Sequence, residues 1–164
     1  MNKPKQPLTT DQALNRASAL CAASEQAPGD IREKLMRWGL TADQASDILG
    51  RLIDDGFIDE RRYACAFVND RFSFNGWGRV KIAYQLRHKG IAPDVISQAL
   101  TNIDERQYRE RLIELLRGKW REVNGRGPRA AWAAMMRFAA SRGFEPAVAA
   151  DCVKQVSHID DQDD

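Results

Sequence analysis

The chain has 164 residues, of which 43% are hydrophobic and 29% are charged, and its formal net charge at pH 7 is +2. This apolar content suffices for a packed core, so disorder is expected only near the two ends. No run of eighteen apolar residues and no apolar segment behind the first residues occurs, so we expect a protein that neither crosses nor is exported through a membrane and that works in the cytoplasm.

The three cysteines, Cys21, Cys65 and Cys152, form no CxxC pair, and no residue set has the spacing of a zinc site. Reduced, buried thiols in a reducing compartment are therefore expected, with no metal.

The charge is distributed unevenly along the chain. Residues 1–60 carry a net charge of −3, residues 61–90 and 105–142 carry +6 each, and residues 143–164 carry −5. The two basic segments could therefore face phosphate or an acidic protein, and the acidic end would be repelled by phosphate.

Apolar residues recur at spacings of three and four from Ala13 to Val156, and no segment alternates as a strand would. The predicted fold class is therefore all-α. Helices are predicted over residues 10–23, 29–38, 42–54, 60–74, 78–89, 93–102, 105–123, 129–142 and 146–156.

The same pattern of residues connects two consecutive helices at three places in the chain. A glycine ends a helix, an apolar residue follows it, and the next helix begins three residues after the glycine; the three glycines are Gly39, Gly90 and Gly143. We therefore predict three tandem three-helix repeats over 9–56, 57–103 and 104–156, between a flexible N-terminus (1–8) and an acidic flexible tail (157–164). Because each triplet is too small to bury its own face fully, the repeats are expected to form an elongated, curved helical array.

The helix predicted over 60–74 has a capping residue at its start and an apolar side, and one arginine lies on that apolar side. Asp59 is placed to accept hydrogen bonds from the free N–H groups at the start of this helix. Its apolar side is expected to pack in the core and consists of Tyr63, Ala64, Phe67 and Phe74. Arg71 lies on that same side, so we favour an internal ion pair for it, with a phosphate or partner contact as the alternative.

The next helix presents a basic stripe with an aromatic inside it. Lys81, Tyr84, Gln85 and His88 share its outward side, with Arg79, Arg87 and Lys89 nearby. This face could contact nucleic-acid phosphates or an acidic protein, and a merely solvated helix face fits it equally well. Trp77 could stack on a base, although a Trp at a helix entrance more often packs between adjacent helices.

In the third repeat, Tyr108, Leu112, Leu116 and Trp120 form one i+4 row that is expected to be buried. Glu110 and Glu114 are expected to neutralise the arginines of that helix by i,i+4 pairing. The less balanced cations, Arg126, Arg129, Arg137 and Arg142, could extend a basic surface from the second repeat.

No catalytic constellation emerges from the residue types. His88 and His158 are the only histidines, neither lies near a patterned nucleophile or ligand set, and no GxxxxGKS/T or GxGxxG motif occurs. We therefore expect a binding protein that is not an enzyme and has no cofactor.

The segment from Gly56 to Ile91 reads GFIDERRYACAFVNDRFSFNGWGRVKIAYQLRHKGI and resembles the RecX family, bacterial regulators of the RecA recombinase. Many members have a second Asp after the residue matching Asp59, where this chain has Glu60. The resemblance implies a modular three-repeat helical fold and binding in the groove of a RecA filament on DNA. It also implies suppression of RecA ATPase, strand exchange and co-protease activities, within homologous recombination, DNA repair and the SOS response.

On this basis the expected partners are the RecA filament and single-stranded or duplex DNA, and the chain is expected to be a monomer. The candidate contact residues are Arg62, Arg71, Trp77, Arg79, Lys81, Tyr84, Arg87, His88, Lys89, Arg126, Arg129 and Arg137. The expected structural residues are Gly39, Gly56, Asp59, Tyr63, Phe67, Gly90 and Gly143. Two alternatives remain, a stand-alone helical DNA-binding module and a helical scaffold for another protein.

Overall fold

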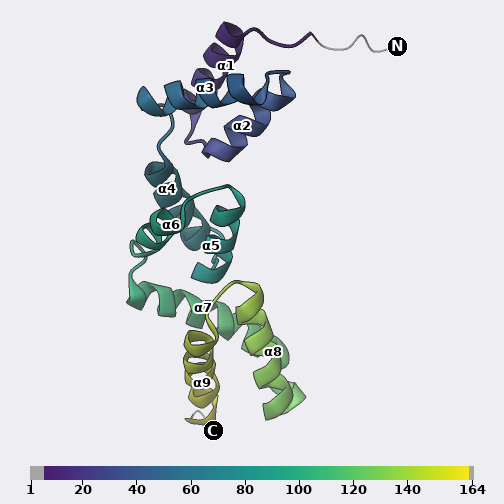
Figure 1. Ribbon diagram of the computed structural model, residues 1–164. Coiled ribbons are helices and arrows are strands. Elements are labelled where there is room, and N and C mark those ends of the chain that lie inside the picture. The colour runs from purple at the N-terminus through teal and green to yellow at the C-terminus, as the bar shows by residue number, and fades with distance from the viewer. Residues whose placement is uncertain (1–5, 163–164) are drawn as a thin grey trace, which may run out of the picture. The chain divides into compact units, whose positions relative to one another are not determined.

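The computed structural model describes the backbone of residues 6–162 and the side chains of residues 6–158. Within that range all regular structure is helical, which confirms the predicted fold class (Figure 1). The helices are α1 (Thr10–Ala23), α2 (Pro28–Arg37), α3 (Ala42–Asp54), α4 (Glu60–Ser73), α5 (Arg79–His88), α6 (Pro93–Leu100), α7 (Glu105–Val123), the 3-10 turn η1 (Asn124–Arg126), α8 (Pro128–Ser141) and α9 (Pro146–Gln162).

The three helix ends predicted from the sequence share one backbone geometry, which Gly56 at the end of α3 also has, with a φ angle of 78°. The glycines have positive φ angles of 93°, 80° and 90°, at Gly39, Gly90 and Gly143. The apolar residue after each glycine is buried and donates its N–H back into the preceding helix, as Leu40 to Leu35, Ile91 to Leu86 and Phe144 to Ala139, at 3.0–3.2 Å. This is the closure expected where a helix ends on a left-handed residue.

Contacts divide the chain into two compact units. Unit 1 contains residues up to Ala66 together with Leu86–Ile96. Its core lies among α1, α2 and α3 and consists of Ala13, Ala17, Ile31, Leu35, Leu40, Ala45, Ile48, Leu49, Leu52 and Ile58. Capping boxes at Thr9 and Thr41 fix the starts of α1 and α3, because each Thr hydroxyl accepts from the N–H three residues later.

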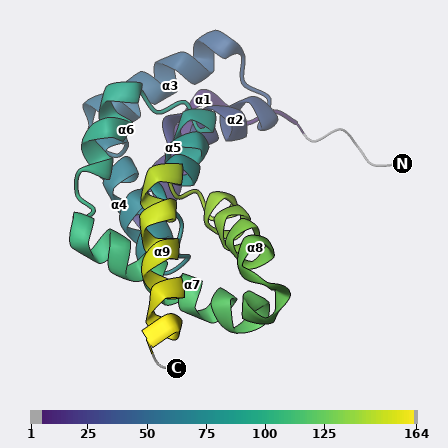
Figure 2. The same ribbon diagram turned by 90° about the horizontal axis from the view of Figure 1, so that it is seen from below.

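Unit 2 contains residues Phe67–Gln85 together with the chain from Ser97 onward. Here α8 and α9 both pack against α7 and against each other (Figures 1 and 2). The predicted i+4 row of α7 forms the centre of this packing, since Tyr108, Leu112 and Leu116 are fully buried. Trp120, the fourth member of the row, was also expected to be buried but is only half-buried. Residues 57–103, the predicted second repeat, contribute to both units, so the division into three repeats stays a prediction.

The structure describes part of the two segments that were expected to be flexible, and their flexibility stays a prediction. Leu8 packs against the unit 1 core, and its N–H donates to the Trp38 carbonyl at 3.0 Å. Helix α9 continues to Gln162, beyond the predicted end at residue 156, because no glycine or proline stops it. Residues 1–5 and 163–164 lie outside the described range.

Within the described residues no helix is both long enough and apolar enough to span a membrane.

Candidate partner-binding surface

The start of α5 is held in unit 2 by a contact between two glycines. Gly78 donates its N–H to the Arg142 carbonyl at 2.7 Å, and the Val80 N–H donates to the Gly143 carbonyl at 2.9 Å. A Cβ on Gly78 would lie 2.3 Å from the Gly143 oxygen, and one on Gly143 would lie 2.2 Å from the Lys81 Cβ. Only residues without a side chain permit this approach, which places α5 against the turn between α8 and α9.

Arg79, a candidate contact residue, is bound inside unit 2. Its guanidinium forms ion pairs with Glu105 and, at 2.7 Å, with Glu145, and it lies 3.9 Å from the centre of the Tyr108 ring. The backbone N–H of Arg79 donates to the Tyr108 hydroxyl at 3.0 Å, and that hydroxyl donates to the Glu145 carboxylate. We call these four residues the Arg79 cluster. The cluster joins the first residues of α5 and α7 to the residue before α9.

Burial and these hydrogen bonds shift the pKa values in the Arg79 cluster. Burial, together with the hydrogen bond to Glu145, raises the pKa of Tyr108 well above its ordinary value. Burial by itself would raise the pKa of Glu145, but the hydrogen bonds from Tyr108 and Arg79 outweigh it and lower that pKa. Glu145 is therefore held as a carboxylate.

Two cations and two aromatic rings pack together beside this cluster. The Phe67 and Trp77 rings meet edge to face with centroids 6.4 Å apart. The Arg71 guanidinium lies 4.9 Å from the Phe67 centroid and 5.2 Å from that of Trp77, and the Lys81 ammonium lies 4.5 Å from Trp77. Trp77 therefore packs within the fold at the α4–α5 connection, with a cation–π contact from each neighbouring helix.

The internal ion pair expected for Arg71 is wrong within the described part of the chain. Arg71 contacts the Phe67 and Trp77 rings and reaches the Asn75 side chain at 3.4 Å. An arginine can satisfy a partly apolar site by stacking on aromatic faces, which spares the cost of burying a carboxylate beside it.

The apolar role expected for Phe74 is also wrong. Phe74, the residue after the end of α4, is 80% exposed. Val80 and Tyr84 on α5 are 51% and 52% exposed and share one helix face, since they are four residues apart. We call Phe74, Val80 and Tyr84 the exposed apolar set of unit 2.

The remaining candidates of the segment 56–90 lie in unit 1, where two of them have fixed partners. Arg62 pairs with Glu25 at 2.9 Å and also donates to the Gly56 carbonyl. Lys89 pairs with Asp30 at 2.8 Å, and this hydrogen bond raises the pKa of Lys89. Their charges hold the fold together.

The other residues of this segment for which the sequence predicts a role are exposed at a helix end, cap a helix or pack in the core. Arg87 and His88 are exposed at the end of α5. Asp59 accepts the Arg62 N–H at 3.1 Å, as expected of a helix cap. Ala64 is fully buried, Phe67 is nearly so, and Tyr63 is half-buried.

The basic residues of the third predicted repeat separate into two groups. Arg106 pairs with Glu110, Arg109 with Glu105 and Asp151, and Arg111 with Glu114. The second group is exposed and has no carboxylate partner among the described residues; it consists of Arg117, Arg121, Arg126, Arg129 and Arg137. Arg142 lies 5.3 Å from the Phe138 ring centre and donates to the Asn75 carbonyl, so it belongs to the packing of unit 2.

The described side chains form neither a metal-binding group nor a disulfide, and some of them have the features of a protein interface. Among residues 6–158, no group of three or more His, Cys, Asp or Glu side chains could hold a metal ion. None of the three cysteines forms a disulfide. Cys152 is buried and Cys21 is half-buried, and burial raises the pKa of both thiols, whereas Cys65 is exposed against expectation. Exposed aromatic and aliphatic side chains near cations are typical of protein interfaces.

Sequence reasoning missed the partners of the Arg79 cluster. Tyr108 was recognised as a core residue, but nothing in its i+4 row indicates that its hydroxyl would meet Glu145. One signal was present, since Glu145 stands directly before the first residue of α9, where a carboxylate is favoured.

Residues 59–100 of this chain match a family model described as "RecX, second three-helix domain". The regulatory protein RecX of Pseudomonas putida strain GB-1 is 33% identical over 138 residues, which are 84% of this chain and 86% of that protein. The regulatory protein RecX of Mycolicibacterium smegmatis is 32% identical over 111 residues, but the match spans only 59% of that protein's length.

Solved structures resemble the fold. The crystal structure of RecX from Lactobacillus salivarius has a TM-score of 0.82 at 18% identity and covers 90% of this chain and 96% of that one. A crystal structure titled regulatory protein RecX has a TM-score of 0.78 at 22% identity, over 89% of this chain and 73% of that one. The helical fold and the relatives' names place this chain among all-helical regulatory proteins. It belongs to the RecX family.

Proposed function

We propose that this chain binds the RecA filament on DNA and inhibits its ATPase, strand-exchange and co-protease activities. Membership of the RecX family supports a regulatory role, and the exposed apolar set of unit 2 is the observation that carries the proposed contact. The set lies within the segment that resembles the family most closely. The regulated partner, the activities and the contact residues are all part of the proposal.

The exposures of Phe74, Val80 and Tyr84 support a docking role for this face. Isolated exposed apolar residues are common. Here, however, Phe74 is 80% exposed, and Val80 and Tyr84 on one face of the next helix are half-exposed, so all three lose a favourable burial unless a partner covers them. Lys81 and Arg71, stacked on Trp77, supply positive charge near the same loop. An aromatic centre with cations beside it is the composition of interface hot spots.

The proposed mechanism is selection of one filament arrangement. This mechanism takes ATP hydrolysis by the filament to be coupled to a change in the arrangement of its neighbouring subunits. A ligand that binds one arrangement better than the others shifts the population toward it and slows the cycle. Binding across a subunit interface would give this chain the required preference.

The first experiment measures ATP hydrolysis by RecA of the same organism on single-stranded DNA while this protein is added. Inhibition at amounts well below those that coat the DNA is expected. The variant Val80→Ser/Tyr84→Ala should need about thirtyfold more protein for half inhibition, because each of the two lost apolar anchors weakens binding by about 1 kcal/mol.

A matched control separates contact from general surface change. Ile53 on α3 is 50% exposed, almost the same as Val80, and Met36 on α2 is also exposed. The variant Ile53→Ser/Met36→Ala should inhibit as the wild type does. Equal loss in both variants, or no inhibition by the wild type at equimolar amounts, would argue against the proposal.

A second candidate function, DNA binding by the chain itself, is favoured by the five exposed arginines of unit 2 that lack a carboxylate partner in the described structure. Binding to phosphates would fall steeply with salt. The variant Arg126→Gln/Arg129→Gln/Arg137→Gln should then lose affinity for single-stranded DNA and show a smaller salt slope. Absence of binding at low salt would eliminate this function.

A further inference from the structure

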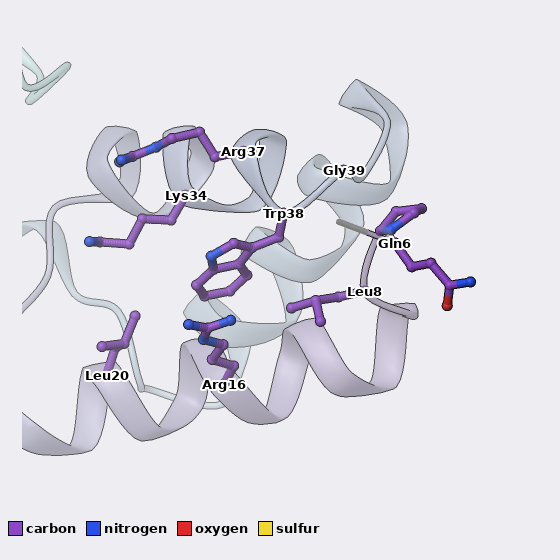
Figure 3. Close-up of a pocket in the computed structure, with 9 residues that line it drawn as sticks. Gln6, Leu8, Arg16, Leu20, Lys34, Arg37, Trp38 and Gly39 are labelled. Carbon is purple, nitrogen blue, oxygen red and sulfur yellow. The ribbon is translucent and has the colours of Figure 1, made fainter. Parts of the chain in front are cut away.

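Unit 1 contains a pocket of about 710 Å³ between α1 and the end of α2 (Figure 3). Its walls combine two kinds of side chain, cations and apolar groups. The cations are Arg16, Lys34 and Arg37, and the apolar groups are Leu8, Leu20 and Trp38. Figure 3 shows Trp38 and Lys34 descending from α2 toward α1, with Arg16 beneath the indole.

One wall of the pocket is fixed by close backbone packing. Leu8 donates its N–H to the Trp38 carbonyl at 3.0 Å, and Gly39, with φ of 93°, lets Pro7 approach. A Cβ on Gly39 would lie 2.4 Å from the Pro7 Cβ, so the N-terminal segment could not follow this path past any other residue. The backbone packing therefore fixes the position of this wall of the pocket.

The positive charge of the pocket is not neutralised by the fold. The Arg16 guanidinium stacks on Trp38 with its centre 4.8 Å from the ring centroid, which orients its N–H groups without consuming them. Lys34 and Arg37 have no carboxylate partner in the described range, whereas Arg62 and Lys89 of the same unit are paired. No acidic residue is among those that line the pocket.

Unit 1 as a whole does not share the positive charge of its pocket. Positions 1–66 and 86–96 carry 11 basic and 11 acidic residues, so their formal net charge is 0. A polyanion such as a nucleic-acid strand is bound by an extended basic surface, and a unit with no net positive charge does not supply one beyond the pocket. A short ligand with one or two anionic groups does not need such a surface.

We propose that this pocket binds a short acidic peptide segment of a partner protein, with an apolar or aromatic side chain next to its carboxylates. The carboxylates contact Arg16, Lys34 and Arg37, where bidentate pairing with arginine is available. The apolar side chain packs on Trp38 and Leu20. This inference does not rest on the proposed function, because it concerns a binding property of unit 1 alone.

The test follows the four indole N–H signals of the full-length, ¹⁵N-labelled protein by NMR. The chain has four tryptophans, Trp38, Trp77, Trp120 and Trp132, and Trp38→Phe assigns the signal of interest. The probe is the peptide acetyl-Glu-Asp-Phe-Asp-Glu-amide. We expect a saturable shift of the Trp38 signal, while the signals of the other three tryptophans remain in place.

Two control peptides separate charge from apolar contact. In acetyl-Gln-Asn-Phe-Asn-Gln-amide the carboxylates are replaced by amides, and in acetyl-Glu-Asp-Ser-Asp-Glu-amide the ring is removed. Both should bind several-fold more weakly than the probe. Equal binding of the uncharged peptide would overturn the inference.

The protein variants are a matched pair of exposed arginines in unit 1. Arg37→Gln removes a pocket cation, and Arg51→Gln removes a cation on α3 that does not line the pocket. Arg37→Gln should weaken probe binding roughly threefold to fivefold, as for one partly exposed charge contact, and Arg51→Gln should not. Neither residue has a fixed partner among those described, so both variants should keep the wild-type melting temperature.

Three results would refute the proposal. The first is an unchanged Trp38 signal at millimolar probe, and the second is equal weakening by the two arginine variants. The third is a Trp38 shift produced by a dodecamer of thymidylate at lower concentration than by the peptide, which would assign the pocket to nucleic acid.

Discussion

Cations of the basic segment 61–90 serve different roles that depend on their neighbours. Arg79 and Lys89 are bound in ion pairs, Arg71 and Lys81 stack on aromatic rings, and Arg87 is exposed. Charge reversal at Lys89 would therefore place a carboxylate beside Asp30 and disturb the fold as well as the surface. Only the exposed members of the segment give a clean test of partner contact.

The Arg79 cluster should contribute measurably to stability. Arg79→Met removes the partner of Glu145 and Glu105 and leaves the Glu145 carboxylate less compensated. We expect the free energy of unfolding, measured by urea denaturation, to fall by about 1–3 kcal/mol. The control Arg106→Met breaks the Arg106–Glu110 pair, in which Arg106 is 87% exposed, and should change stability by less than about 0.5 kcal/mol.

Glu145 should make unfolding sensitive to acid. Its pKa in the folded protein is lowered, so its contribution is fully present above its unfolded value of about 4.3 and is lost as pH falls through the folded pKa. Glu145→Gln should therefore reduce the loss of unfolding free energy between pH 7 and acid. An equal loss in the variant and the wild type would show that Glu145 does not report this linkage.

At the scale of the element, helix boundaries were predicted closely because local chemistry sets them. The starts at Thr10, Ala42 and Glu105 and the ends at Ala23, Asp54 and Val123 agree with the sequence expectation. Capping side chains and glycines act within a few residues, so their signal can be seen without the fold. The end of α9 was missed because no stop signal follows residue 156.

Gly78 should be irreplaceable at the start of α5. A methyl group there would lie 2.3–2.5 Å from the Gly143 and Phe144 backbone and would break the two hydrogen bonds that hold α5. We expect Gly78→Ala to lower the unfolding free energy by about 2 kcal/mol or more.

Gly118 provides a control of opposite sign for that experiment. It lies inside α7 with open space around it, so Gly118→Ala should raise stability by roughly 0.5–1 kcal/mol. Thermal unfolding of the two variants side by side tests both values, and a destabilised Gly118→Ala would count against this account.

At the scale of the whole molecule, the repeat predicts an extended particle. If each three-helix repeat contacts only its neighbours, the radius of gyration should exceed the value of about 15 Å expected for a compact globule of this length. Small-angle X-ray scattering measures this radius. A radius near 15 Å would instead favour a compact arrangement of the repeats.

The sequence alone determined the helical class, most helix boundaries, the threefold glycine punctuation and the family, because these depend on periodicity and on residues within one turn of each other. The sequence did not show which cations form ion pairs or stack on aromatic rings within the fold. It also did not show that Phe74 is exposed, or that Arg16, Lys34 and Trp38 line one pocket. Those outcomes depend on contacts between residues far apart in the chain. Periodicity shows which face of a helix is apolar, but it does not show which charge will lie opposite it.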